Sequence, residues 1–255
     1  PVEGKSGNPV FFSFFDVFSP GELELLIESD ADPEKMVYTS VAETEKEFRL
    51  ALEKKVRRFV LGSIRGIENF ERAKIGAGVG NVDVLLRVQP IEDVEAAVST
   101  SGIQSKFGVV FSDDEDSVGN ALKQIKEKDL NFAGFHFHLG SQVSNPSHYV
   151  EAIDKVLGYA EDKDLDIRIL DIGGGYPVTY SESKPSIEKF GKKITDSIQK
   201  WRDRLGDFKL IMEPGRFLTA ESGVLVTEIV NLKELYGRKV IVIDASEDMV
   251  SVDRH

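Results

Sequence analysis

The segment with the most chemical potential is residues 134–141, which reads GFHFHLGS. If it is a strand, His136 and His138 lie two residues apart and point to the same side. A histidine at a strand end can stack on an aromatic cofactor, and Gly140-Ser141 can bind phosphate through a backbone N–H and a hydroxyl. Taken alone, the segment is explained more simply by a core histidine with satisfied hydrogen bonds.

A second candidate is the segment Glu213-Pro214-Gly215-Arg216. A carboxylate at a strand end could pair with a protonated pyridine nitrogen, which keeps such a ring cationic and makes it a strong electron sink. Arg216 could hold a phosphate group through two parallel hydrogen bonds. A turn with a surface ion pair explains this motif alone about equally well.

Two further segments are weaker signals. Gly173, Gly174 and Gly175 follow an apolar run. Three consecutive glycines cost backbone entropy on folding, and this cost is explained if their N–H groups must approach an anion closely. A plain loop explains the run equally well, and the spacing of a dinucleotide-binding motif is absent. Residues 105–108, SKFG, follow a Ser-Thr-Ser-Gly stretch and by themselves indicate a solvated loop.

These segments must be positioned by strands that end near one another. Short apolar runs alternate with helical patterns, and we expect strands at 36–38, 58–61, 82–88, 132–139, 167–172, 208–212, 224–230 and 240–243. We expect a helix starting at Ser19-Pro20, with Glu22 closing a capping box, and helices at 43–54, 64–74, 114–127, 146–160 and 185–204. This alternation indicates parallel strands joined by right-handed crossovers, and the number of units favours a (β/α)8 barrel over an open doubly wound sheet.

Composition narrows the possible partners. The 255 residues carry a net charge of −12, which argues against binding nucleic acid or an anionic membrane surface. There is no cysteine, so disulfides and zinc–thiolate sites are excluded and a cytoplasmic protein is the simplest expectation. No apolar run is long enough to suggest a membrane span, and the first residues do not read as a signal peptide.

Together the four motifs resemble one known family. HFHLGS, DIGGGYP, EPGR and SKFG occur in the order and approximate spacing of the fold-type III pyridoxal-phosphate decarboxylases, which include ornithine, lysine, arginine and diaminopimelate decarboxylases. The resemblance extends from about Phe15 to Asp244. It implies a TIM barrel of the alanine racemase-like type that binds pyridoxal 5′-phosphate, and no metal.

The resemblance also assigns roles to individual residues. His138 resembles the histidine that stacks on the cofactor ring, and Glu213 resembles the carboxylate that pairs with its nitrogen. Arg87 looks like the barrel arginine behind the ring. The remaining residues resemble a phosphate cradle (Ser141, Gly174, Gly175, Gly215 and Arg216) and two acids near the cofactor-binding lysine (Asp16 and Glu22).

Two parts of the sequence depart from the family pattern. The nearest match to the cofactor-binding lysine is Lys5, but its spacing to the following Asn and Pro is wrong, and it lies eleven residues before Asp16 instead of about twenty. We expect a barrel over residues 1–238 and only the start of a C-terminal β-domain over 239–255. In the family that domain supplies a catalytic cysteine, an acidic residue for the distal substrate amine and a phosphate-binding tyrosine.

The leading functional prediction is decarboxylation of a basic or diamino acid, either of the diaminopimelate or of the ornithine/lysine type. A racemase of similar barrel would place an arginine near the ring nitrogen, so Glu213 favours decarboxylation. Two alternatives stay open: a catalytically impaired homologue that binds a regulatory protein, and an amino-acid racemase. The resemblance further implies a homodimer with shared active sites.

Overall fold

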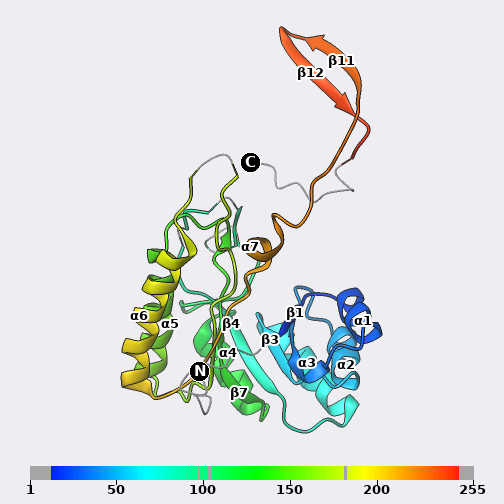
Figure 1. Ribbon diagram of the computed structural model, residues 1–255. Helices are drawn as coiled ribbons and strands as arrows, with labels where there is room; N and C mark the ends of the chain where they lie inside the picture. Colours follow the sequence, from blue (N-terminus) through cyan, green and yellow to red (C-terminus); the bar gives the residue numbers. More distant parts are fainter. Residues whose placement is uncertain are drawn as a thin grey trace, which may run out of the picture.

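A computed structural model describes residues 13–92, 94–96, 98–100, 102, 105–180 and 183–246. Its main sheet contains seven parallel strands that follow one another in sequence and in space (Figure 1). They are β1 (Phe15–Val17), β2 (Met36–Thr39), β3 (Arg58–Leu61), β4 (Asp83–Gln89), β7 (Asn131–His136), β9 (Ile169–Asp171) and β10 (Lys209–Ile211). The short strand β6 (Val109–Val110) pairs with the end of β4, and β5 (Val98–Ser99) pairs with β8 (Gly140–Ser141).

A helix follows each of these seven strands before the next one begins. The helices are α1 (Pro20–Glu28), α2 (Glu45–Glu53), α3 (Ile64–Ala77), α4 (Val118–Glu127), α5 (Ser147–Asp162), α6 (Ile187–Leu205) and the short α7 (Gly215–Thr219), with a 3-10 turn η1 at Pro33–Lys35. The helices α1 to α6 cover the outer face of the sheet, whereas the short α7 lies at the strand ends, as Figure 1 shows. The predicted alternation of parallel strands and crossover helices is therefore confirmed.

The inner face of the sheet carries its own apolar cluster. It takes one residue from each of six neighbouring strands: Val37, Val60, Leu85, Ala133, Ile169 and Ile211. Side chains from strands at opposite ends of a sheet can join one cluster only if the sheet curls round on itself, as in a barrel. The predicted barrel-type α/β fold is confirmed, and the main sheet contains six of the eight expected strands together with β1, which was not expected.

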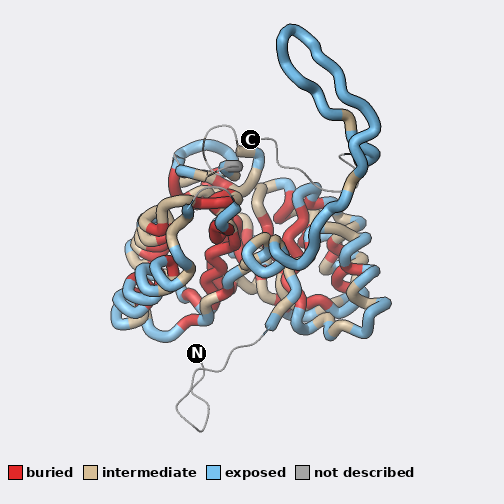
Figure 2. Tube along the Cα trace, turned by 45° about the horizontal axis from the view of Figure 1, so that its top comes forward, coloured by how far each residue is buried: buried red, intermediate tan, exposed pale blue. Residues whose placement is uncertain are grey.

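The two edge strands also approach each other. Phe14, directly before β1, lies against Lys209 of β10, with 5.4 Å between the lysine Nζ and the ring centroid. A larger apolar cluster fills the space between sheet and helices, and Figure 2 shows this buried layer on both sides of the molecule. Its aromatic part includes Phe48, Phe59 and Phe70, whose rings pack edge-on or tilted against one another.

Several predicted boundaries were wrong for local reasons. The helix predicted at 43–54 begins at Glu45, because Thr44 caps it and forms a reciprocal capping box with Glu47. The helix predicted from 114 begins only at Val118, after the N-cap Ser117. The strand predicted at 132–139 ends at His136, and the strand β1 was not predicted at all.

The last described elements stand apart from the sheet. β11 (Ile229–Leu235) and β12 (Arg238–Ile243) form an antiparallel hairpin that projects from the body and is almost wholly exposed (Figures 1 and 2). The strand predicted at 224–230 was mostly wrong, since residues 224–228 pair with nothing in a described strand and β11 starts at Ile229. The expected domain boundary after residue 238 falls inside β12, which begins at Arg238. Among the described helices, none combines the length and apolar character needed to cross a membrane.

Candidate active site

A polar layer lies directly above the apolar inner cluster. Four of its members follow a residue of that cluster by two positions in the sequence: Thr39, Arg87, Asp171 and Glu213. Successive residues of a strand alternate between the faces, so these side chains share the inner face and lie one step nearer the carboxyl ends of the strands. This end of a barrel is where active sites are built.

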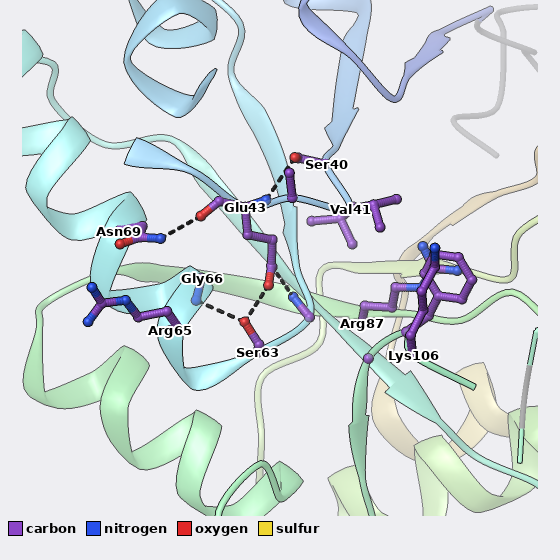
Figure 3. Close-up of a pocket in the computed structure, with 14 residues that line it drawn as sticks. Ser40, Val41, Glu43, Ser63, Arg65, Gly66, Asn69, Arg87 and Lys106 are labelled. Atoms are coloured by element: carbon purple, nitrogen blue, oxygen red, sulfur yellow. Dashed lines mark hydrogen bonds between the residues drawn. The ribbon is translucent and has the colours of Figure 1, made fainter. Parts of the chain in front are cut away.

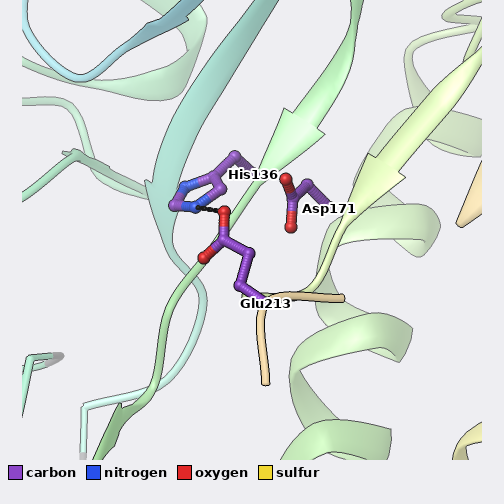
Figure 4. Close-up of side chains that lie close together, drawn as sticks. All are labelled: His136, Asp171 and Glu213. Carbon is purple, nitrogen blue, oxygen red and sulfur yellow. Dashed lines mark ion pairs between the residues drawn. The ribbon is translucent and has the colours of Figure 1, made fainter. Parts of the chain in front are cut away.

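Glu213 is the centre of this layer. Its Oε1 lies 3.5 Å from His136 Nε2 (Figure 4). Its Oε2 lies 4.0 Å from His138 Nδ1. Both histidines therefore approach Glu213, although the strand β7 ends at His136 and His138 lies beyond it. One ligand-type atom each from His136, Asp171 and Glu213 falls within 4.8 Å of the other two, a composition that could also hold a metal ion.

The glycine run connects the other two strand-end motifs. The Gly174 N–H donates to His138 Nδ1 at 3.1 Å, and the Glu213 N–H donates to the Gly173 carbonyl at 2.9 Å. A Cβ at Gly174 would overlap the Glu213 carbonyl oxygen, and one at Gly175, which has a φ of +94°, would overlap the Gly140 carbonyl oxygen. We expected the glycines to bring N–H groups to an anion. In the structure, close packing against the neighbouring motifs already requires glycine at 174 and 175.

Three acids share one cation in this layer. Burial raises the pKa of Asp16 well above its ordinary value, and the nearby Glu213 and Asp171 raise it further. The hydrogen bond from Thr39 acts in the opposite direction and lowers this pKa. Burial likewise raises the pKa of Asp171 to about 8 and that of Glu213 to about 7. Arg87, which is 6% exposed, favours the ionised form of Glu213, while burial lowers the pKa of Arg87 itself.

Both histidines are neutral at physiological pH. Burial lowers the pKa of His136 to about 4, and burial together with His136 and Arg87 lowers the pKa of His138 to about 3. The Nδ1 of His138 accepts the Gly174 N–H, so in the neutral ring the proton resides on Nε2. A neutral imidazole fixed in this way presents a flat face that can stack on an aromatic ring.

The remaining predicted site residues lie around this layer. Ser141 is in β8, directly after the histidine segment, and Gly215 and Arg216 open α7, directly after Glu213. Glu22 is different, because it is exposed at the start of α1 and its Oε2 accepts the Phe18 N–H at 2.6 Å. The predicted capping box is therefore shifted by one residue: Ser19 accepts the Glu22 N–H, but Glu22 reaches the residue before the N-cap. Lys5 lies outside the described residues.

Sequence reasoning missed three residues of this region. His136 and Asp171 were read as parts of motifs without a role, although their spacing of two from His138 and Gly173 places them on the same inner face. Glu43 was read only as the start of a helix. It is 8% exposed and has a φ of +48°, and its carboxylate accepts hydrogen bonds from the Gly62 N–H at 2.5 Å and from the Ser63 hydroxyl (Figure 3).

Glu43 also lines a cavity of about 290 Å³ at the ends of β2, β3 and β4. Arg87 and residues 106–108 of the SKFG segment lie on the opposite wall of this cavity (Figure 3). Burial raises the pKa of Glu43 to about 7, although hydrogen bonds from Gly62 and Ser63 act in the opposite direction. The SKFG segment, which alone indicated a solvated loop, thus borders the polar layer through Arg87.

The polar layer fits the cofactor that the resemblance implies. Glu213 Oε1 is buried and, within the described part of the chain, accepts no hydrogen bond from a fixed donor, so the carboxylate keeps acceptor positions for a proton-bearing nitrogen. A pyridinium would supply the positive charge that three acids and one arginine lack. His138 and Glu213 are the residues of this layer that would hold such a ring.

Comparison with known proteins agrees with this arrangement. Residues 13–220 match the family described as pyridoxal-dependent decarboxylase, pyridoxal binding domain. Diaminopimelate decarboxylase of Vibrio cholerae is 32% identical over 240 residues, which cover 92% of this chain and 56% of that protein. The Staphylococcus aureus enzyme of the same name is 33% identical and is covered to 52% of its length.

Solved structures of decarboxylases are also similar to this chain. Diaminopimelate decarboxylase from M. jannaschii superposes with a TM-score of 0.78 at 27% identity, covering 92% of this chain and 55% of that one. Lysine/ornithine decarboxylase from Vibrio vulnificus, in complex with putrescine, gives 0.70 at 26% identity, covering 91% of this chain and 58% of that one. This chain spans little more than half the length of these relatives. The match over residues 13–220 and the polar layer at the strand ends show that the chain belongs to the pyridoxal-dependent decarboxylase family, within its pyridoxal binding domain.

Proposed function

We propose that this chain takes part in the pyridoxal-phosphate-dependent decarboxylation of a diamino acid, with diaminopimelate as the first substrate to test. Diaminopimelate decarboxylases are the relatives that match it at about 30% identity over about 90% of its length. Two structures of such enzymes hold L-lysine, which is an amino acid of the same class. The cofactor, when bound, supplies an electron sink for the electron pair left behind as carbon dioxide departs.

The chain's own residues have distinct tasks in this proposal. Glu213 holds a proton at the ring nitrogen; burial raises the pKa of this acid, and Arg87 acts against burial and favours the carboxylate form that this task needs. His138 fixes the plane of the ring from one side, held in place by the Gly174 N–H. Ser141, Gly175 and Arg216 bind the phosphate group. Asp16 stays close to the reacting end of the ring, anchored by Thr39 at 2.9 Å.

The observation that supports this proposal best is the position of Glu213. A buried carboxylate beside an arginine and two neutral histidines is what a cationic pyridine ring requires. A racemase of this barrel type would weaken the electron sink at that position with an arginine. The acid found here therefore favours loss of carbon dioxide over exchange of enantiomers.

The test measures carbon dioxide release from diaminopimelate, lysine and ornithine by the protein supplemented with pyridoxal phosphate. Glu213→Gln should lower the rate by about 10²–10⁴-fold, the usual range for a lost proton-holding group. Glu221→Gln, at an exposed glutamate, is the matched control. Cofactor binding without gas release would favour the regulatory homologue, and racemisation without gas release would favour the racemase. Failure to bind the cofactor at all would overturn the proposal.

We also propose that the protein forms a homodimer in the cytoplasm. The exposed hairpin β11–β12 carries apolar residues, among them Leu232 at 67% and Ile241 at 57% exposure, which is unusual for a surface in contact with water alone. Light scattering during size-exclusion chromatography tests the assembly, and cell fractionation tests the location. A monomer at micromolar concentration would contradict the first part.

A further inference from the structure

Two buried carboxyl groups, those of Asp171 and Glu213, lie close together in the polar layer, with one oxygen of each within 4.8 Å of the other (Figure 4). Asp171, at the end of β9, is fully buried, and its Oδ1 accepts the Gly173 N–H at 3.0 Å. Its Oδ2 and the Oε1 of Glu213 are both buried and, among the described residues, both lack a hydrogen-bond partner. Two acceptors that meet in this way become partners only if one of them carries a proton.

The charges around this pair also require a proton. Asp16 faces it from β1, Arg87 from β4, and His136 and His138 from β7 and the segment after it. The histidines are neutral, so the three acids would leave two uncompensated negative charges if all were ionised. Like charges in a buried site cannot all ionise, and one carboxyl of such a pair keeps its proton.

The groups around Asp171 and Glu213 determine which of the two acids keeps the proton. Arg87 is the strongest influence that lowers the pKa of Glu213, whereas for Asp171 the strongest influences, burial and Glu213, both raise it. A hydrogen bond between the two side chains acts in opposite directions on them: it raises the pKa of Asp171 and lowers the pKa of Glu213. His136 Nε2 is 3.5 Å from Glu213 Oε1, too long for a good hydrogen bond, so it does not replace Asp171 as the donor.

We propose that Asp171 is a positioning residue that carries a proton and donates an O–H hydrogen bond to Glu213, so that Glu213 stays ionised toward the ring nitrogen. This inference rests on the proposed function, because it concerns the same ring-binding acid. A donated hydrogen bond makes a carboxylate less basic, and the proton shared with the ring then resides on the ring nitrogen. Without the donor, Glu213 would compete for that proton.

The test compares a variant that keeps a donor at this position with a variant that removes it. Asp171→Asn keeps the oxygen that accepts the Gly173 N–H and keeps a donor facing Glu213, but it cannot titrate. Asp171→Leu removes the donor. Asp166→Asn, at an exposed aspartate shortly before the same strand, is the matched control. The first measurement is infrared difference spectroscopy on the protein without cofactor.

In that measurement, the wild type minus Asp171→Asn should show the carbonyl stretch of a protonated acid near neutral pH, and this band should disappear as the pH rises through about 8. The second measurement is nitrogen NMR of the ring-labelled cofactor bound to each protein. The ring nitrogen should stay protonated in the wild type and in Asp171→Asn, and its signal should shift toward the unprotonated position in Asp171→Leu.

The outcomes separate this inference from the proposed function. If the wild type binds no cofactor, the proposed function fails while the infrared difference still tests the proton on Asp171. If the infrared difference shows no protonated acid, or if both variants shift the ring nitrogen signal equally, the inference is overturned. Should Asp171→Leu not fold, the infrared comparison with Asp171→Asn decides alone.

Discussion

Replacing Glu43 with glutamine should make the stability of this protein less sensitive to pH. Glu43 is buried near the N-terminus of α3, and burial raises its pKa to about 7, from an ordinary value of 4.5. Between these two values the folded state binds more protons than the unfolded state. Stability attributable to this group is therefore present at low pH and is lost as the pH rises through that window.

The magnitude follows from the two pKa values. Each unit corresponds to about 1.4 kcal/mol, so ionisation of Glu43 should lower the free energy of unfolding by about 2–3 kcal/mol between about pH 5 and pH 8. Glutamine has the same shape. Its oxygen can accept the Gly62 N–H, and its amide can donate to Ser63. The variant should keep the hydrogen bonds of Glu43 and lose its titration.

The assay is urea denaturation of wild type and Glu43→Gln at several pH values across this range. The difference in free energy of unfolding between the two proteins should shift by about 2–3 kcal/mol in favour of the variant as the pH rises. Glu53→Gln, at an exposed position of α2, is the control and should give a constant difference. A constant difference for Glu43→Gln as well would refute the reasoning, because Glu43 would then titrate alike in both states.

Three further changes test the inner layers. Gly174→Ala should weaken cofactor binding at least tenfold, because the added methyl group overlaps the Glu213 carbonyl oxygen. Gly191→Ala is the control and should leave cofactor binding unchanged, because nothing lies within 4 Å of a Cβ at that position. Titration with the cofactor measures both affinities. Leu85→Ala, in the apolar inner cluster, should lower the free energy of unfolding by about 2–5 kcal/mol in urea. Arg87→Met should raise the pKa of Glu213 further and destabilise the protein by about 3–5 kcal/mol near pH 8, with a smaller loss near pH 5.

The regular elements could be predicted because their signals are local. The strand β3 at Arg58–Leu61 was predicted to the residue, since it is a short apolar run between charged helical segments. The segment at 224–226 shows the limit of this signal. It is as apolar as a strand, but Val224 is 91% exposed and Val226 87% exposed, and no described strand pairs with it. An apolar run forms a strand only if another strand pairs with it through hydrogen bonds, and the local sequence does not identify that partner strand.

The site was predictable where a motif ends a strand and not where a turn brings in a distant residue. His138 and Glu213 follow strands directly, so their convergence could be expected once the barrel order was assumed. Glu43 could not be expected, because it reaches Gly62, nineteen residues away, only through a left-handed backbone conformation. Its one sequence signal is Gly66, where a Cβ would overlap the Glu43 carboxylate. A glycine in the first turn of a helix does not by itself indicate a buried acid beside it.

The alternation within each strand explains why this site favours a cationic ring. The layer of Val37, Leu85, Ile169 and Ile211 closes the floor and keeps water away from the acids one step above it. Water exclusion raises the pKa of each acid and strengthens every interaction among them. Asp16, Asp171 and Glu213 then share Arg87 alone, and the layer, as far as the structure describes it, lacks positive charge. A neutral ring would leave that deficit in place, whereas a ring protonated at its nitrogen removes part of it. A pyridine ring bound in this layer would therefore be favoured in its protonated form, which is the form that accepts electrons best.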